Sequence, residues 1–309
     1  MKDLGKLSVR TEKIDESAAD QRIDNYLLRL CKGVPKSHIY RILRSGEVRV
    51  NSRRVDAAYR LQEGDAVRIP PIRVAERTEK REAPAAEFPV LWEDSTLLAI
   101  NKPAGVAVHG GSGVSFGAIE QLRRSRPEAR FLELVHRLDR GTSGVLLFAK
   151  KRSALVAMHD LLRSGATDKR YLALVKGRWT KARLKVDASL HKYVNAEGER
   201  RVAVDNDGKN AVTLFALRKS WSEASLVEAT LKTGRTHQIR VHLAHLGFPI
   251  CGDDKYGDFP FNRSLAKHGL KRMFLHAARL AFVHPLTGTP IVIEAPLPAT
   301  LEHFLLTLV

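Results

Sequence analysis

One carboxylate stands out because two cations flank it. Residues 136–144 read HRLDRGTSG and are followed by the apolar run VLLF. Arg137 and Arg140 lie close to Asp139 along the chain, and nearby positive charge favours an ionised carboxylate. Asp139 is therefore a candidate nucleophile or general base. An aspartate that only caps the turn, by accepting the backbone N–H groups of the residues after it, fits the same pattern equally well.

A second segment combines cations with a helix N-terminus. Residues 233–245 read TGRTHQIRVHLAH, and the spacing of their apolar residues predicts a helix over 236–246. The start of such a helix attracts anions. Arg235 and Arg240 are thus candidates to contact a phosphate or the carboxylate. The histidines lack HExxH spacing, and the two cysteines lie far apart, so no metal site is expected.

A third segment, KRYLALV at 169–175, places Tyr171 at the start of an apolar strand. Most such tyrosines belong to the core. The functional alternative is a ring that stacks on a nucleic-acid base, which is worth about 1–3 kcal/mol. The sequence alone leaves both open. The glycine-rich residues 110–113 lack the pattern of a phosphate loop or a dinucleotide site, so no nucleotide cofactor is expected.

The charge of the chain points to a polyanion. Of the 309 residues, 52 are Lys or Arg and 34 are Asp or Glu, a formal net charge of +18. Binding to phosphates releases condensed counterions and gains free energy from such an excess. A basic surface that only keeps the protein soluble is the alternative. The excess is concentrated in residues 21–60, which hold ten basic and three acidic residues.

These residues also begin a small module. Helical spacing predicts one short helix from Ile23 to Leu30 and another after Pro35, with strands near 48–50 and 66–69. The patterns QRID at 21–24, KSHI at 36–39 and GEVRVN at 46–51 resemble the S4 RNA-binding domain. That resemblance implies a helix pair that faces phosphates, although solvated charges are the commoner outcome. The candidate RNA-binding residues are Lys36, Arg41, Arg44, Arg49, Arg53 and Arg54.

Residues 70–88 are rich in Pro, Ala and alternating charges, which predicts a linker between two domains. We place the S4 domain at 20–83 and a larger domain at 88–309. The larger domain has more predicted strands than helices, joined by short connections, which indicates an α+β fold with a mixed, largely antiparallel sheet flanked by helices. The expected strands are 96–100, 144–149, 171–175, 211–217, 225–231, 279–283 and 291–294, and the expected helices are 117–124, 153–163, 236–246 and 300–306.

No run of about 20 apolar residues predicts a membrane span, and the first twenty residues are too charged for a signal peptide. We therefore expect a cytoplasmic protein with no membrane partner. Nothing in the sequence indicates an oligomer, so a monomer is the default expectation.

Several segments together resemble the RluA family of pseudouridine synthases. They are 101–105, 108–109, 136–144, 169–175, 233–242, 275–277 and 284–285. The resemblance implies a cofactor-free isomerisation, in which the N-glycosidic bond of a uridine breaks, the uracil turns and its C5 rejoins the ribose. A likeness to one subgroup, carried by 33–37, 108–113 and 131–136, implies 23S (large-subunit) ribosomal RNA as the partner.

The same resemblance implies roles for four residues. Asp139 is the essential nucleophile or base. Tyr171 packs on the target uracil and assists removal of the proton from C5. Arg240 pairs with Asp139, and Arg137 enters the space left by the flipped nucleotide. Flipping is required because a base inside a duplex cannot be reached.

Two other functions fit parts of the sequence. A glycoside hydrolase also acts at an anomeric carbon, but it needs two carboxylates. Asp253 and Asp254 are the possible second acid, and their turn context favours loop capping instead. A non-catalytic ribosome-assembly factor that binds RNA through the S4 module is the second alternative.

Overall fold

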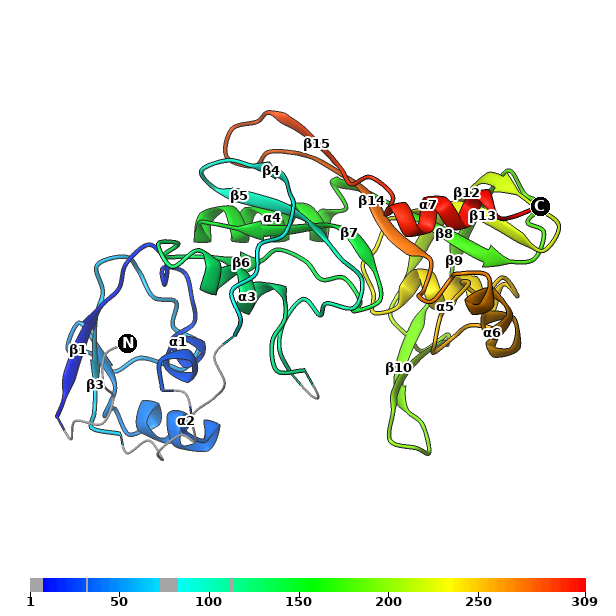
Figure 1. The fold of residues 1–309 in the computed structure, drawn as a ribbon. Coiled ribbons are helices and arrows are strands. Elements are labelled where there is room, and N and C mark those ends of the chain that lie inside the picture. Colours follow the sequence, from blue (N-terminus) through cyan, green and yellow to red (C-terminus); the bar gives the residue numbers. More distant parts are fainter. Residues whose placement is uncertain (1–7, 32, 73–82, 112–113) are drawn as a thin grey trace. The chain divides into compact units, whose positions relative to one another are not determined.

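The computed structural model describes residues 8–31, 33–72, 83–111 and 114–309 (Figure 1). The chain forms two compact units, residues 1–82 and residues 83–309. Most of the predicted linker, at 73–82, lies outside the described residues. No helix in the described part of the chain is long and apolar enough to cross a membrane.

The first unit packs two helices against a small antiparallel sheet with the strand order β1-β3-β2. Both predicted helices are present, because their apolar residues recur on one face and share one core with the strands. The sequence reading did not include β1. The elements are β1 (Arg10–Lys13), α1 (Ile23–Leu30), α2 (Lys36–Arg44), β2 (Arg49–Val50) and β3 (Ala66–Ile69).

The second unit is built on a ten-stranded sheet with the order β4-β5-β7-β14-β8-β13-β12-β9. In addition, β15 pairs with β14 and β6 pairs with β7. Among the described strand pairs only β7 and β14 run parallel, so the predicted mixed, largely antiparallel sheet is confirmed. The strands are β4 (Val90–Glu93), β5 (Leu97–Lys102), β6 (Glu133–Leu134), β7 (Ser143–Ala149), β8 (Thr167–Lys176), β9 (Arg183–Asp187), β12 (Val212–Ser220), β13 (Ala224–Leu231), β14 (Leu275–Val283) and β15 (Pro290–Glu294).

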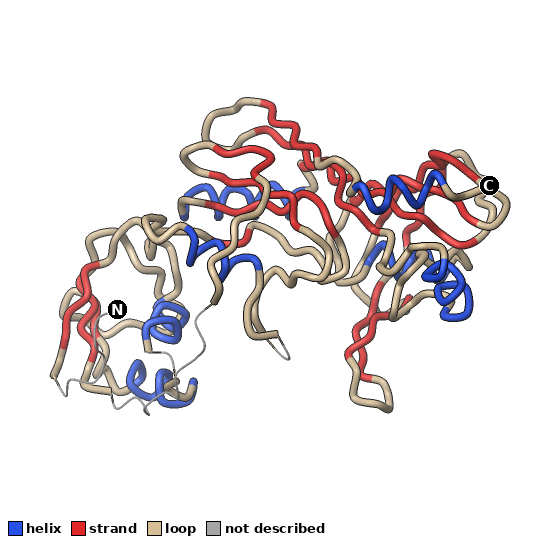
Figure 2. The backbone as a smooth tube through the Cα atoms, viewed as in Figure 1, coloured by secondary structure: helices blue, strands red, loops and turns tan. Residues whose placement is uncertain are grey.

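Helices cover this sheet, as the tube in Figure 2 shows. Alternate residues of β5 and β7 enter two different cores, one shared with α3 and α5 and the other shared with α4. Burial on both faces explains why the β7 sequence is a continuous apolar run. The helices are α3 (Ala118–Ser125), α4 (Arg152–Ser164), α5 (Gln238–His245), α6 (Phe259–Lys267) and α7 (Ala299–Leu306).

Strands β4, β6 and β9 of the large sheet were not predicted, and neither were helix α6 and an outlying hairpin. Helix α6 buries only Leu265 and so shows no apolar period; it begins where the Asp258 carboxylate accepts the Phe261 N–H at 2.9 Å. The hairpin of β10 (Leu190–Val194) and β11 (Arg200–Val204) projects from the unit and exposes most of β10 (Figure 1). Such an exposed hairpin lacks the apolar alternation of a half-buried strand.

The start of β7 lies unusually close to β14. Gly144 has φ of +111°, and a Cβ on it would lie 2.2 Å from the carbonyl oxygen of Ala277. Ala277 is its partner in the parallel register between the two strands. Only glycine fits both the backbone conformation and this approach. The loop that precedes β7 therefore ends at a position that is closely packed against β14 in the sheet.

Substitution at this glycine provides a test of the close approach. We expect Gly144→Ala to lower the free energy of unfolding by about 3–5 kcal/mol, because the added methyl group meets backbone. Gly141→Ala is the matched control, since its Cβ would meet only the flexible Met273 side chain, at 3.3 Å. The control loses less than about 1 kcal/mol. Equal unfolding midpoints in urea for the two variants would contradict this reading.

Candidate active site

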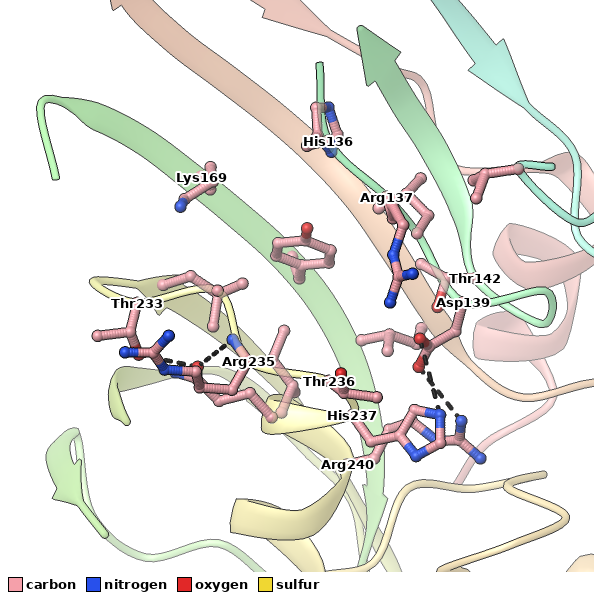
Figure 3. A pocket seen from close by; sticks show the side chains of 18 of the residues that line it. His136, Arg137, Asp139, Thr142, Lys169, Thr233, Arg235, Thr236, His237 and Arg240 are labelled. Atoms are coloured by element: carbon pink, nitrogen blue, oxygen red, sulfur yellow. Dashed lines mark hydrogen bonds and ion pairs between the residues drawn. The ribbon is translucent and has the colours of Figure 1, made fainter. Parts of the chain in front are cut away.

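A cavity of about 770 Å³ opens where the loop before β7, strand β8 and the start of α5 meet (Figure 3). Its size is within the usual range of a small-molecule site. The loop contributes residues 136–140 and Thr142, and β8 contributes Lys169 and Tyr171. The segment that leads into α5 contributes residues 231–240. The three chemistry-bearing segments of the sequence therefore line one cavity.

Asp139 presents its carboxylate to this cavity. Its backbone carbonyl accepts the Thr142 N–H at 3.0 Å, so the main chain closes the turn. The carboxylate instead accepts a hydrogen bond from Arg240, with 3.2 Å between Nη1 and Oδ2. Its other oxygen, Oδ1, lies 3.9 Å from Nε2 of His237. In the described structure the carboxylate is therefore not the turn cap that the sequence left open.

Arg240 reaches Asp139 from the buried side of α5. Its side chain is 7% exposed, and its Nε and Nη2 atoms donate to the two carboxylate oxygens of Asp253, both at 2.7 Å. Burial acts to lower the pKa of Arg240, but the hydrogen bonds and charge of Asp253 outweigh it and raise the pKa above its ordinary value. Arg240 therefore remains a cation next to Asp139.

Asp253 is held on three sides. Besides Arg240, its carboxylate accepts the backbone N–H groups of Lys255 at 2.8 Å and Tyr256 at 3.0 Å. Burial acts to raise the pKa of Asp253, yet the hydrogen bonds from Arg240 lower it below its usual range. A buried carboxylate engaged in this way is not free to act as a general acid, which counts against the glycoside hydrolase alternative.

Tyr171 meets both descriptions that the sequence left open. Its ring belongs to the main core of the second unit and also lines the cavity. It alternates along β8 with outward-facing residues, so Lys169 shares its face. Burial, together with the charge of Asp139, raises the pKa of Tyr171 above its ordinary value. The hydroxyl thus stays protonated at neutral pH.

Other cations surround the cavity. Arg137 is exposed, and its guanidinium points into the cavity beside Asp139 (Figure 3). Arg235 lines the cavity too, but its Nε donates to the carbonyl of Asn210 at 3.0 Å, so Arg240 rather than Arg235 contacts the carboxylate. Lys169 lies farther along β8, and burial lowers its pKa. The cavity is thus suited to a substrate that carries negative charge.

Comparisons with known proteins identify the family of this chain. The family model described as RNA pseudouridylate synthase matches residues 96–245, and the S4 domain model matches residues 21–67. The chain is 54% identical to ribosomal large subunit pseudouridine synthase C from Yersinia pestis, over 96% of this chain and 94% of that protein. The protein of that name from Escherichia coli strain K12 is also 54% identical, with 96% of each chain covered.

The chain belongs to the RNA pseudouridylate synthase family. Among solved structures, it is similar to human RNA pseudouridylate synthase domain containing 4, with 26% identity and a TM-score of 0.59 over 70% of this chain and 91% of that one. The fold also matches human RNA pseudouridylate synthase domain containing 1, with a TM-score of 0.58 over 70% of this chain and 86% of that one. The resemblance seen in the sequence is therefore confirmed, and the chain is an isomerase of the pseudouridine synthase class.

The S4 module of this pseudouridine synthase carries the other candidate residues. Lys36, Arg41 and Arg44 are exposed on α2, while Arg49, Arg53 and Arg54 are exposed after it. Arg41 forms an ion pair with Glu47, at 3.7 Å. Among the described residues, no side-chain hydrogen bond or ion pair engages Lys36, Arg44 or Arg53. Their charges are therefore available to a phosphate, and phosphate binding stays a prediction.

The sequence reading missed three residues that organise the site. Asp253 was expected to cap a loop, which it does, but its pairing with Arg240 was not foreseen. His237 is one of the histidines whose spacing was tested only for a metal site. Among the described residues, no cluster of three or more acidic, His or Cys side chains is placed to hold a metal ion. Lys102 is the third, at the end of an apolar strand pattern.

Lys102 acts from beneath the loop that carries Asp139. Its side chain is fully buried, and its Nζ donates to the carbonyls of Pro103 and Val106, both at 2.8 Å, and of Arg140 at 3.4 Å. Burial lowers the pKa of Lys102 to about 7. No spacing rule pointed to it, because the accepting carbonyls come from a turn and a loop that only the fold brings together.

The buried pair of Arg240 and Asp253 can be tested by removing one charge. We expect Asp253→Asn to lower the free energy of unfolding by about 3 kcal/mol, because a buried guanidinium loses its closest counter-charge. The Asp253 pKa is depressed in the folded state, so the stability from its ionised form is present above the unfolded value of about 3.9 and lost at lower pH. The difference between wild type and variant should therefore shrink below about pH 4.

Asp254→Asn is the control for that experiment. The Asp254 carboxylate lies 3.4 Å from the same guanidinium, but it is 95% exposed. Its removal should leave the unfolding midpoint nearly unchanged at neutral pH. A larger loss from Asp254→Asn than from Asp253→Asn, in urea titrations at pH 7, would contradict the assignment.

Proposed function

We propose that this pseudouridine synthase isomerises uridines of 23S (large-subunit) ribosomal RNA, with Asp139 as the reacting group and without a cofactor. The observation that carries the proposal is the Asp139 carboxylate, which faces the cavity while the buried Arg240 donates to it. The relatives named for the ribosomal large subunit support the choice of RNA, since they match nearly the full chain.

The reaction needs no group from outside the RNA and the protein. The bond between ribose C1′ and uracil N1 breaks, the uracil turns, and C5 bonds to C1′. The proton then lost from C5 is balanced by one taken up at N1, so the product is an isomer of uridine. Asp139 acts as a nucleophile on the sugar or the uracil ring, or as a base on a sugar proton. Each route uses the carboxylate, whose Oδ2 accepts a hydrogen bond from the buried Arg240 at 3.2 Å.

Tyr171 supplies the surface on which the uracil turns. A ring that is fixed in the core on one side and lines the cavity on the other offers a rigid apolar platform. Its protonated hydroxyl stays available as a hydrogen-bonding group while the proton leaves C5. Arg137, exposed at the cavity, fills the space that the flipped uridine leaves in the RNA.

The S4 module supplies affinity in this proposal. Helix α2 has Lys36 in its first turn and no acidic residue there, which is unfavourable for the helix dipole unless an anion binds nearby. An RNA phosphate is such an anion. Residues 20–83 would thus position the RNA through phosphates, while residues 88–309 select and isomerise the base.

The chemistry can be tested by tritium release from large-subunit ribosomal RNA labelled at uridine C5. Wild type should release tritium without added metal or nucleotide. Asp139→Ala should be slower by about 10³-fold or more, because the group that acts in the chemical step is gone. Asp254→Asn, which removes an exposed carboxylate near the same arginine, should keep the wild-type rate.

The outcomes of this assay separate the alternatives. Wild-type release from Asp139→Ala would place the chemistry on another residue. Tight RNA binding with no release from any variant would instead support the non-catalytic assembly factor. Release of free uracil would indicate hydrolysis rather than isomerisation.

The role of the S4 module has its own test. We expect the double variant Lys36→Ala, Arg44→Ala to bind the RNA more weakly, with the slope of log K against log salt reduced by about 0.7–0.9 for each phosphate that is no longer neutralised. Arg60→Ala is the control, because Arg60 is exposed in the same unit but already donates to Asp20. An unchanged salt slope in the double variant would remove these residues from the RNA interface.

A further inference from the structure

His237 has a backbone conformation that its residue type does not favour. It precedes α5 with φ of +54° and ψ of 20°, in the left-handed region, and its side chain forms no capping hydrogen bond to the helix. A residue with a Cβ adopts this conformation at a cost in free energy, and Asn or Gly adopts it more readily. The helix start by itself therefore gives no reason for an imidazole at this position.

The imidazole has a defined partner on each side. Nδ1 lies 2.8 Å from the hydroxyl of Tyr256, and the two rings pack edge to face with centroids 5.4 Å apart. Nε2 faces Oδ1 of Asp139 at 3.9 Å (Figure 3). The ring thus lies between a hydroxyl and the candidate reacting carboxylate.

The surroundings determine which ring nitrogen carries the proton. The Tyr256 hydroxyl accepts the backbone N–H of Val202 at 3.0 Å, so its own proton is free to be donated to Nδ1. Burial is the main effect that lowers the pKa of His237, so the ring is neutral at pH 7. Burial also raises the pKa of Tyr256, which keeps its hydroxyl protonated. When Tyr256 donates its proton to Nδ1 in this way, Nε2 carries the ring proton and directs it at Asp139.

The two oxygens of Asp139 consequently face different donors. Arg240 donates to Oδ2 at 3.2 Å, whereas His237 approaches Oδ1 and is still beyond hydrogen-bond distance. Hydrogen bonds in an active site are often long before the substrate binds and shorten in the reacting complex. Closing this gap requires a movement of only about 1 Å.

We propose that His237 is a positioning residue for Asp139, which donates from Nε2 to Oδ1 in the RNA complex while Arg240 holds Oδ2. Tyr256 fixes the tautomer that makes this possible, and the Val202 N–H of hairpin β10–β11 orients Tyr256. The inference rests on the proposed function, in which Asp139 is the reacting group. A carboxylate with both oxygens held presents one fixed geometry to the ribose or the uracil.

Two substitutions of His237 separate this role from a purely structural one. Asn tolerates the left-handed backbone but is too short to reach Asp139. Gln fits the backbone less well, yet its amide Nε2 extends about as far as the imidazole Nε2 and donates a hydrogen bond. A structural role at the helix start favours Asn over Gln, whereas donation to Asp139 favours Gln over Asn.

The experiment uses large-subunit ribosomal RNA labelled with tritium at uridine C5. It measures single-turnover tritium release and, separately, the Kd of the protein for this RNA. We expect His237→Asn to slow release by about 10–100-fold with Kd changed by less than about twofold, and His237→Gln to stay within about fivefold of wild type. Tyr256→Phe keeps the ring but loses the hydroxyl, and should slow release by about 3–10-fold. In the His237→Asn background it should have little further effect, because both changes act through one hydrogen bond to Asp139.

Several results would overturn the proposal. These are a wild-type rate in His237→Asn, equal losses in the Asn and Gln variants, additive effects of the double variant, or a loss confined to Kd. Unfolding midpoints of all variants identify any loss that comes from misfolding, and Tyr256→Phe leaves the strained backbone untouched. Failure of the proposed function looks different, since wild type would then release no tritium or Asp139→Ala would release it normally.

Discussion

The buried guanidinium of Arg240 is the interaction on which the site depends. A cation that is 7% exposed is tolerated only because Asp253 holds two of its nitrogens, and this arrangement leaves Nη1 directed at Asp139. Burying the Arg240–Asp253 pair costs desolvation free energy, which the two short hydrogen bonds between them offset. The pair also fixes the position from which Arg240 donates to the Asp139 carboxylate.

The sheet holds the Asp139 loop with comparable rigidity. β7 is buried along its whole length, and the approach of β14 at Gly144 leaves no room for a side chain. Beneath the loop, Nζ of Lys102 donates to the carbonyl of Arg140 and to two carbonyls of the turn after β5. A carboxylate that a central strand and a buried lysine hold in place needs little rearrangement when a substrate arrives, which suits the role proposed for Asp139.

The two units place different demands on their charges. On the first unit, the cations of α2 are exposed and mostly unpaired among the described residues, which suits contacts that neutralise phosphates without reading sequence. In the second unit, the arginine that contacts Asp139 is buried and pairs with the carboxylates of Asp139, Asp253 and Asp254. An exposed charge can follow a flexible polyanion, whereas a buried one serves a single fixed geometry.

The sequence by itself determined the fold class, both helices of the S4 module, most strands of the large sheet and the three segments that line the cavity. Local information suffices there, because apolar periodicity and turn residues depend on neighbours along the chain. It also identified Asp139, Tyr171, Arg235 and Arg240 as candidates. The residue pattern left open which arginine contacts the carboxylate, and only the family resemblance implied Arg240. The tertiary structure shows that contact, and it alone decided that Asp253 holds Arg240 and that Lys102 and His237 face the same loop. These contacts join residues separated by up to about a hundred positions, such as Arg240 and Asp139, and no local pattern encodes a distance of that kind.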